Sequence, residues 1–359
     1  MRLLLLIKGM GLGGAEQHVL QIATAMRDRG HAVLVAYLLP HKGELAAVLK
    51  ARGIETVCWG RSGHPWWRST WRLAWSGLKD FRPDTVHAHL PVTGMLARLF
   101  KPLLGYRLVY TEHITYALLH PLTRLVHRAS WAIDDAAVSC SQGVADSLPR
   151  ASVVVDNGIN ALVPPVSAPG MRATLGLPAT SRVLLCVANF RRQKNHPLLL
   201  RAFDRAVQAG DLRDWRLVLV GQDASQRTAC EQLANSLSSR QQIHFAGKRA
   251  EAATWMSEAD AFVLSSDEEG LPLALLEAMR AGLPAVVTAA GGMPQVVTPQ
   301  TGLVVPRGDE AALACALQQI ASEPTLRAKL GAAARDRFLQ HYTQDAMLDR
   351  LECIYGGNI

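Results

Sequence analysis

Short runs rich in Leu, Val and Ile alternate with longer amphipathic stretches through the first half of the chain. The apolar runs occupy residues 2–8, 31–39, 85–90, 107–113, 136–141 and 152–159. Short apolar runs separated by helical patterns are typical of βαβ units around a buried parallel sheet. The first half is therefore predicted to be an α/β domain.

The same pattern restarts after a Pro- and Gly-rich segment at residues 160–170. The second set of apolar runs occupies residues 182–190, 215–223, 242–247, 261–266, 284–289 and 302–306, and helical spacing returns at 342–355. We predict two doubly wound, Rossmann-like domains, with boundaries at 1–164 and 165–340 and a closing helix at 341–359. Such domains bind ligands at the carboxyl ends of their strands, so a site in a cleft between them is expected.

A length of 359 residues and a hydrophobic content of 49% agree with two folded domains. The apolar run Leu3–Ile7 is too short for a secretory signal and ends at Lys8, so it is better explained as a first strand. No apolar run reaches the roughly 18 residues needed to span a bilayer. These features predict a cytoplasmic protein.

The cysteine positions and the charge distribution further restrict the class of protein and its possible partners. The six cysteines form no C-x-x-C pair, which predicts buried, reduced thiols and no metal site. Residues 1–170 hold 18 Lys/Arg against 11 Asp/Glu, a charge of +7 out of +8 for the whole chain. This asymmetry suits an anionic membrane or an acidic substrate. Nucleic acid is disfavoured because zinc-finger spacing, RNP-like aromatics and a basic arm are missing from the sequence.

A glycine-rich loop follows the first apolar run. Gly9, Gly11 and Gly14 fit the G-x-G-x-x-G dinucleotide pattern, but the second strand ends in Leu39 and Pro40 where an acidic residue should hold the ribose. The pattern therefore does not favour a dinucleotide cofactor. It is compatible with backbone that approaches a ligand at a helix N-terminus, or simply with a tight turn.

Histidines mark the strand ends of the first domain. His113 ends a predicted strand, a position that favours a functional role, although a lone histidine is also often structural. His87 and His89 alternate along one strand and share a face, which can suggest a metal. No third ligand is evident from the sequence, so we predict no metal.

Six segments, in chain order, resemble the family-four retaining glycosyltransferases of the GT-B fold, of the bacterial surface-polysaccharide type. They are GLGGAEQHVLQIATAMRDRGHAV, RPDTVHAHLP, VDNGIN, VANFRRQKNHPLLLRAF, ADAFVLSSDEEGLPLALLEAMRAGLPAVVT and TGLVVPRGD. The resemblance implies an acceptor-binding first domain, a donor-binding second domain and a last helix that returns to the first. It also implies a nucleoside-diphosphate sugar as co-substrate, with no other cofactor and no metal.

The resemblance assigns roles to residues of the second domain. Glu269 and Glu277 match the E-x7-E motif, with Glu269 beside the donor sugar and Glu277 on the ribose hydroxyls. Gly270, Leu271 and Pro272 then lead into a helix whose N-terminus receives the diphosphate.

Cations and a loop of the first domain complete the predicted site. Lys194 matches the family lysine, and Arg191 is predicted to replace the arginine usual at Asn189, with Arg192 as a second donor-binding cation. Gly13 and Gly14 are assigned to the donor, and His113 matches a histidine near the reaction centre. For Glu277 and for the basic segment, an ordinary surface role is the alternative.

The same resemblance also implies a reaction mechanism and a class of acceptor. No carboxylate of the first domain stands out as a nucleophile, which favours same-face attack by the acceptor hydroxyl, and no D-x-D triplet occurs, which favours a metal-independent reaction. A sugar-nucleotide epimerase or hydrolase, and a non-catalytic nucleotide-sugar-binding protein, are the competing functions. Acceptors in the family include lipid-linked sugars and surface polysaccharides.

A predicted helix rich in tryptophan is relevant to the kind of acceptor that the first domain binds. Trp67, Trp71, Trp75 and Leu78 form one helical stripe, with Arg68, Arg72 and Lys79 beside it. The stripe suits an anionic membrane interface, or packing against its own sheet. A glycan or lipid-linked acceptor and peripheral binding to the inner face of the cytoplasmic membrane are therefore predicted.

Overall fold

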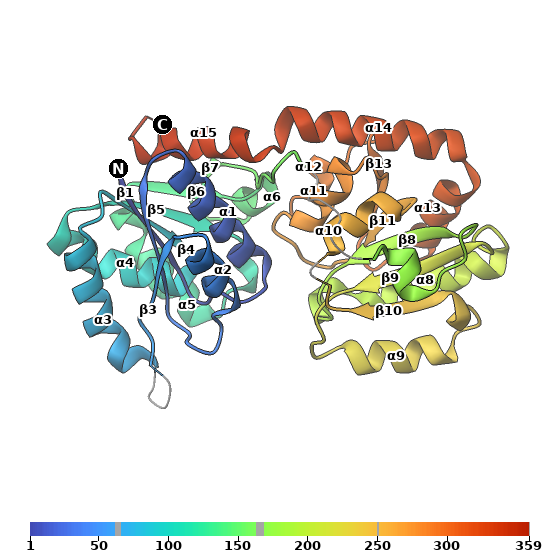
Figure 1. The fold of residues 1–359 in the computed structure, drawn as a ribbon, viewed down its shortest axis with the longest axis horizontal. Helices are drawn as coiled ribbons and strands as arrows, with labels where there is room; N and C mark the ends of the chain where they lie inside the picture. Colours follow the sequence, from blue (N-terminus) through green and yellow to red (C-terminus); the bar gives the residue numbers. More distant parts are fainter. Residues whose placement is uncertain (62–65, 163–168, 250, 359) are drawn as a thin grey trace. The chain divides into compact units, whose positions relative to one another are not determined.

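The computed structural model describes residues 1–61, 66–162, 169–249 and 251–358, without the side chains of 66–69 (Figure 1). The chain divides into two compact units. Unit 1 comprises Met1–Asn157 and Gln344–Ile359, and unit 2 comprises Gly158–Thr343. Each unit is built around one parallel sheet, and each is described by itself below.

Unit 1 contains a seven-stranded sheet in the order β3-β2-β1-β4-β5-β6-β7. Its strands are β1 (Arg2–Ile7), β2 (Ala32–Tyr37), β3 (Glu55–Cys58), β4 (Thr85–His89), β5 (Arg107–Glu112), β6 (Ala136–Ser139) and β7 (Val153–Val154). The strand order reverses between β1 and β4, so loops following these strands diverge and leave room for a ligand at the carboxyl edge.

Helices cover both faces of this sheet. They are α1 (Gly14–Asp28), α2 (Glu44–Ala51), α3 (Trp66–Phe81), α4 (Pro91–Leu104), η1 (Tyr116–Leu118), α5 (Pro121–Ser130), η2 (Trp131–Ile133), α6 (Gln142–Ser147) and α15 (Gln344–Tyr355). Successive residues of β1 alternate between two cores: Leu3 and Leu5 pack with α1 and α15, whereas Leu4 and Leu6 pack with α3 and α4. Burial on both faces explains the unbroken leucine run of the first strand.

Unit 2 repeats the arrangement with a six-stranded sheet in the order β10-β9-β8-β11-β12-β13. Its strands are β8 (Arg182–Val187), β9 (Trp215–Val220), β10 (Ile243–Gly247), β11 (Ala261–Leu264), β12 (Ala285–Thr288) and β13 (Gly302–Val305). Its helices are α7 (Met171–Leu175), η3 (Arg192–Lys194), α8 (His196–Ala209), α9 (Arg227–Ser236), η4 (Arg240–Gln242), α10 (Ala252–Trp255), η5 (Met256–Glu258), α11 (Leu273–Arg280), α12 (Met293–Val296), α13 (Glu310–Ser322) and α14 (Pro324–His341). The reversal of strand order lies between β8 and β11.

The predicted α/β class and the two doubly wound sheets are confirmed. The hydrophobic pattern missed β3, a short edge strand whose outer positions are partly exposed. The predicted division between residues 164 and 165 lies outside the described residues. The closing helix α15 belongs to unit 1, where Glu352 bonds His31 at 2.7 Å and Tyr355 bonds His87 at 2.7 Å.

Two predictions about side chains need correction or restriction. Cys315 and Cys353 are exposed because each lies on the outer face of its helix, so the expectation of buried thiols is wrong for them; Cys140, Cys186 and Cys230 are buried. On α3, Trp71 and Trp75 contact Phe100 of α4, with ring centroids 5.9 and 5.7 Å away, and Trp71 remains 44% exposed. The side chains of Trp67 and Arg68 lie outside the described residues.

Within the described ranges, every helix is too short or too polar to serve as a membrane span.

Candidate functional site

An ion pair joins two loops at the strand-order reversal of unit 2. The Lys194 Nζ lies 2.5 Å from Glu269 Oε1, and the Ser266 hydroxyl donates to the same oxygen at 2.6 Å. Lys194 ends η3 after β8, and Glu269 lies between β11 and α11. The side chain of Glu269 is 8% exposed, so the charge of this carboxylate is compensated by a lysine and a hydroxyl rather than by solvent.

The loop after β8 is fixed to the loop after β11 by further polar contacts. Asn195 adopts the left-handed conformation, with φ 44° and ψ 47°, and caps α8 by accepting from the Leu198 amide at 3.3 Å. Its amide group donates to Asp267 at 3.0 Å, and Ser265 donates to the carbonyls of Lys194 and Asn195. These bonds position Lys194 opposite Glu269, which assigns a structural role to Asp267.

A third loop, after β12, packs directly on the backbone of Glu269. Gly291 has φ +53°, and a Cβ atom there would lie 2.0 Å from the Glu269 carbonyl oxygen. The Gly292 amide donates to the Gly270 carbonyl at 2.7 Å. The close approach requires glycine, because both the backbone conformation and the space exclude a side chain.

Helix α11 begins directly after the loop that follows β11. Pro272 is its N-cap residue, with φ −67° and ψ 125°, and no side chain caps the helix start. The turn Gly270–Pro272 therefore leads into the positive end of a helix dipole, a suitable position for a diphosphate. The donor-binding assignment of Gly270, Leu271 and Pro272 stays a prediction.

Glu277 lies in the second turn of α11 and is partly buried. Burial raises its pKa to about 7, while the positive charge of Arg280 opposes the rise. Its carboxylate forms no hydrogen bond or ion pair with any of the described residues. A partly buried carboxylate without a protein partner is available for a ligand hydroxyl.

Two exposed arginines flank Lys194. Arg191 and Arg192 are solvent-exposed and form no side-chain hydrogen bond or ion pair within the ranges that the structure covers. Asn189, at the position where the resemblance expects arginine, accepts from the Gln222 amide at 2.8 Å and thereby links the loops after β8 and β9. The structure thus assigns Asn189 a structural role and leaves Arg191 and Arg192 as the free cations of this loop.

In unit 1, four histidines gather at the carboxyl ends of the central strands. His89 Nδ1 lies 2.9 Å from His113 Nε2, and the His18 ring from α1 lies 5.3 Å from the His113 ring and 5.8 Å from that of His89. His87 bonds Thr111 at 2.6 Å. Burial lowers the pKa of His18 to about 4 and the pKa of His113 well below its ordinary value, with further lowering at His113 from neighbouring His18 and His87. His113 is therefore neutral at neutral pH.

His18, His89 and His113 also offer three ring nitrogens within 4.8 Å of one another. His18 is a third potential metal ligand that sequence reasoning missed, because helix α1 brings it beside strands far away in the sequence. Three neutral imidazoles suit Zn²⁺. The hydrogen bond between His89 and His113, however, already pairs two of the ring nitrogens with each other.

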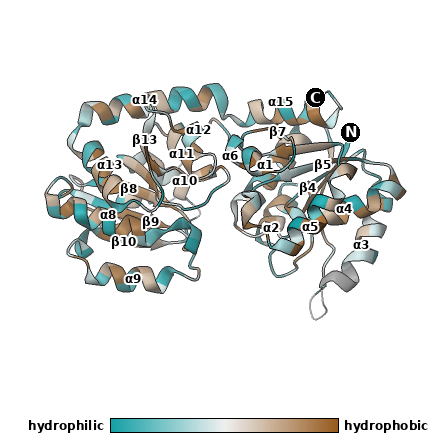
Figure 2. Cartoon of the chain, turned by 180° about the vertical axis from the view of Figure 1, so that it is seen from behind, coloured by the Kyte–Doolittle hydropathy of each residue, from teal (hydrophilic) through white to brown (hydrophobic). Residues whose placement is uncertain are grey.

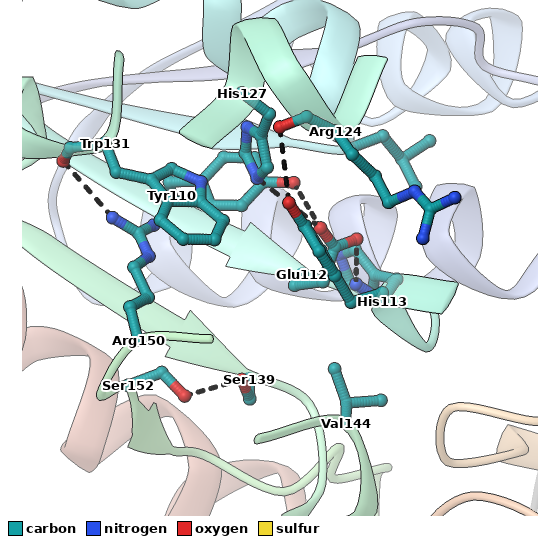
Figure 3. Close-up of polar contacts among 12 residues, drawn as sticks. Tyr110, Glu112, His113, Arg124, His127, Trp131, Ser139, Val144, Arg150 and Ser152 are labelled. Carbon is teal, nitrogen blue, oxygen red and sulfur yellow. Dashed lines mark hydrogen bonds and ion pairs between the residues drawn. The ribbon is translucent and has the colours of Figure 1, made fainter. Parts of the chain in front are cut away.

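Glu112 anchors the backbone of His113. Its carboxylate accepts from Tyr110 Oη at 2.7 Å and from the His113 amide at 3.1 Å, and His127 lies 3.7 Å away (Figure 3). Burial raises the pKa of Glu112 to about 7, while the hydrogen bonds from Tyr110 and from the amides of His113 and Ile114 oppose this rise. Behind it, Arg98 bonds His127 at 2.6 Å and forms a bidentate pair with buried Asp134 at 2.7 Å.

The glycine loop of unit 1 ends at α1. Gly13 is the N-cap residue, with φ −96° and ψ 170°, and Gly14 begins the helix without a side-chain cap. Neither residue needs the left-handed region, so the structure gives them no conformational requirement for glycine at these two positions. A Cβ at Gly13 would contact the end of the flexible Glu16 side chain at 2.2 Å. Their role in donor binding stays a prediction.

The predicted residues thus form two groups, one in each unit. The structure brings Lys194, Glu269 and the Gly270–Pro272 turn together in unit 2 and places His113 among histidines in unit 1. Sequence reasoning missed Ser266 and His18. The sequence SSDEE contains Ser266, but its contact with Glu269 becomes evident only when the conformation of the loop is known.

Solved structures with the same fold are glycosyltransferases and related proteins. HepE from Anabaena in complex with UDP superposes with a TM-score of 0.86 at 19% identity, covering 99% of this chain and 100% of that one. The lipopolysaccharide outer core galactosyltransferase WaaB superposes with a TM-score of 0.74 at 15% identity and covers 100% of both chains. Both similarities establish the GT-B fold.

Sequence comparisons define the family. A model described as Glycosyltransferase Family 4 matches residues 12–161, and one described as Glycosyl transferases group 1 matches residues 181–323. The lipopolysaccharide core biosynthesis glycosyltransferase LpsD of Rhizobium meliloti is 27% identical over an alignment of 355 positions that covers 94% of this chain and 94% of that one. Glycogen synthase of Mycobacterium tuberculosis is 28% identical over 92% of this chain and 88% of its own length. The chain belongs to the family-four glycosyltransferases.

Proposed function

We propose that this glycosyltransferase takes its sugar from a nucleoside-diphosphate sugar bound by unit 2 and transfers it, with retention of configuration, to a glycan or lipid-linked acceptor. The observation that carries the proposal is the Lys194–Glu269 pair. Both described bonds to this carboxylate use Oε1, from Lys194 and from Ser266, which leaves Oε2 for a sugar hydroxyl.

The cations beside this pair suit a diphosphate leaving group. Lys194, Arg191 and Arg192 offer positive charge at the start of α8, and the uncapped start of α11 offers backbone donors. Preorganised donors of this kind stabilise the charge that develops on a departing phosphate. Glu277, which has no hydrogen-bond or ion-pair partner among the described residues, accepts hydrogen bonds from the ribose.

In unit 1 a neutral His113, fixed through its amide by Glu112, can donate a hydrogen bond to a sugar hydroxyl without adding charge. We propose that the acceptor hydroxyl attacks on the face from which the phosphate departs and that this phosphate takes its proton. No cofactor and no metal take part in this proposal.

The relatives support a role in cell-surface polysaccharide synthesis, because one of them is named for lipopolysaccharide core synthesis. UDP and UDP-glucose are present in solved structures of HepE, which has the same fold. The proposed location is the cytoplasm, with peripheral binding to the inner face of the cytoplasmic membrane.

A thermal-shift screen of UDP, GDP, ADP and their sugars tests donor binding, since a ligand of the folded state raises its stability by RT ln(1 + [L]/Kd). One diphosphate family should raise Tm in the wild type and lose this effect in Glu277→Ala. A flat response to all of them would contradict the proposal.

Two readouts separate the competing functions. Acceptor-dependent release of nucleoside diphosphate supports transfer, whereas release that needs only water identifies a hydrolase, and isomerised sugar nucleotide identifies an epimerase. The anomeric configuration of the product, measured by NMR, tests retention.

The histidine cluster calls for a direct metal test. Elemental analysis of the purified protein should find less than stoichiometric zinc, and dialysis against EDTA should leave the transfer rate unchanged. A stoichiometric metal whose removal abolishes transfer would refute metal independence.

A further inference from the structure

Helix α5 has its polar side inward and its apolar side outward. Among its ten residues only His127 is fully buried, whereas Leu122 and Leu125 are 63% and 66% exposed. Val126, and Leu118 of the preceding turn η1, are also exposed. Four of the twelve exposed large hydrophobic residues in the described part of the chain thus lie within residues 118–126.

Polar contacts hold the inward side, where the His127 ring also packs against the rings of Tyr110 and Trp131, with centroids 4.8 and 5.3 Å away. Arg98 of the neighbouring helix α4 bonds His127 at 2.6 Å and the Ser130 hydroxyl at 3.1 Å (Figure 2 shows α4 beside α5). The helix start is fixed by His120, whose ring accepts from the Leu122 amide at 3.3 Å, with Pro121 in the first turn. The orientation of α5 is therefore specified, and its apolar face is presented outward by the fold.

Positive charge borders this face. At 100° per residue, Arg128 lies about 60° from Leu125, at one edge of the stripe formed by Leu122, Leu125 and Val126. Arg124 lies on the same flank, about 40° further towards the buried His127, and is partly buried. Arg128 is exposed, and neither guanidinium has an ion-pair partner among the described residues. Between residues 85 and 135 the sequence contains five Lys/Arg and three acids, and two of the cations are already paired, Arg98 with Asp134 and Lys101 with Asp135.

We infer that the outward face of η1 and α5, formed by Leu118, Leu122, Leu125 and Val126 and bordered by Arg128, with Arg124 beside it on the same flank, docks on an anionic lipid bilayer. An apolar stripe edged by arginines lies in a membrane interface with its leucines among the acyl chains and its cations on the headgroups. A symmetric pairing of two copies through this face would instead place its own arginines close to one another.

This inference deepens the proposed function, since it rests on an acceptor that is lipid-linked or membrane-borne. The surface on α5 is separate from the tryptophan stripe of α3, where Trp71 and Trp75 contact Phe100 and where membrane contact stays a prediction.

Co-sedimentation of the full chain with vesicles tests the inference. The wild type should bind vesicles of phosphatidylglycerol and phosphatidylcholine, but not of phosphatidylcholine alone, and salt should weaken binding. The double variant Leu122→Glu/Leu125→Glu should lose about tenfold or more in apparent affinity, and Arg124→Gln/Arg128→Gln should lose binding together with its salt dependence. The matched control is Leu339→Glu, at a residue 49% exposed on α14 of unit 2, which should bind as the wild type does.

Two outcomes would overturn the inference: a wild type that does not bind anionic vesicles, or a Leu122→Glu/Leu125→Glu variant that binds them as well as the wild type. A wild-type dimer that this variant makes monomeric, without vesicle binding by either, would identify a second copy as the occupant instead. If the glutamate variant fails to fold, Leu122→Ser/Leu125→Ser replaces it.

The Tm rise caused by nucleoside diphosphate, measured on the same samples, distinguishes the two proposals. Lost vesicle binding with an intact nucleotide response refutes only the docking surface. Vesicle binding without any nucleotide response refutes only the proposed donor.

Discussion

The Lys194 ammonium and the Glu269 carboxylate lie 2.5 Å apart and join the loops that follow β8 and β11. The pair stands at the reversal of strand order in unit 2, the position where open parallel sheets bind ligands. Since Ser266 shares the same carboxylate oxygen, the orientation of Glu269 is set before any ligand arrives. The loops after β8 and β11 therefore both have to keep their conformations for this pair to form.

Replacing Gly291 by alanine should disturb Glu269 through the backbone. The added Cβ would lie 2.0 Å from the Glu269 carbonyl oxygen, and φ of +53° is already unfavourable for alanine. We expect Gly291→Ala to lower the unfolding free energy by about 1–3 kcal/mol and to weaken donor binding. Urea unfolding and the nucleotide-dependent Tm shift measure the two effects.

Gly308→Ala is the matched control, because Gly308 has φ +73° but open space around its Cβ position. The Gly308→Ala variant therefore has only the free-energy cost of a positive φ angle at alanine, without a steric clash. Equal destabilisation in the two variants, with donor binding unchanged in both, would show that the contact with Glu269 is unimportant.

The pH dependence of stability should report on Glu277. Burial raises its pKa from 4.5 to about 7, so the folded chain keeps a proton that the unfolded chain releases between these values. Stability therefore falls as the pH rises through that window, by about 3 kcal/mol for this group. Glu277→Gln lacks the carboxyl, and its unfolding free energy should fall correspondingly less between about pH 5 and about pH 8 in urea titrations.

Glu323→Gln, at an exposed position before α14, serves as the control for Glu277→Gln and should keep the wild-type pH dependence. Buried Glu112, whose pKa is also raised to about 7, contributes equally in all three proteins and cancels in the comparison. An unchanged pH slope in Glu277→Gln would mean that Glu277 titrates in its ordinary range.

The hydrophobic pattern was sufficient for the fold because a parallel sheet is buried on both faces. Continuous apolar runs such as Leu3–Ile7 and Val183–Val187 are typical of central strands of a parallel sheet. Glycine and proline residues in the sequence mark where these runs end. The hydrophobic pattern did not predict the edge strand Glu55–Cys58, because the exposed positions of this strand interrupt its run of apolar residues.

The site was only partly predictable. Motif spacing located Glu269 and Lys194, but their pairing depends on loop contacts such as Asn195 with Asp267, which no periodicity encodes. His18 was overlooked because an apolar helix face can contain a histidine without any local signal. Its neighbours His89 and His113 come from strands that only the sheet brings close.

Single substitutions should separate the two exposed arginines. If Arg191 takes the place of the arginine expected at Asn189, Arg191→Ala should lower kcat by about a hundredfold, whereas Arg192→Ala should mainly raise KM for the donor. Steady-state kinetics with varied donor distinguish these effects, and Arg335→Ala on the exposed side of α14 provides the control. A larger loss of kcat in Arg192→Ala would reverse the assignment.

The most direct test of the central claim is the acceptor-dependent release of nucleoside diphosphate by the wild type and by Lys194→Ala. Because Lys194 is paired with Glu269 and is one of the cations proposed to stabilise the leaving diphosphate, its removal should lower kcat by about a hundred- to a thousandfold. Lys329→Ala, at an exposed lysine of α14, should behave as the wild type does. Undiminished transfer by Lys194→Ala would contradict the account.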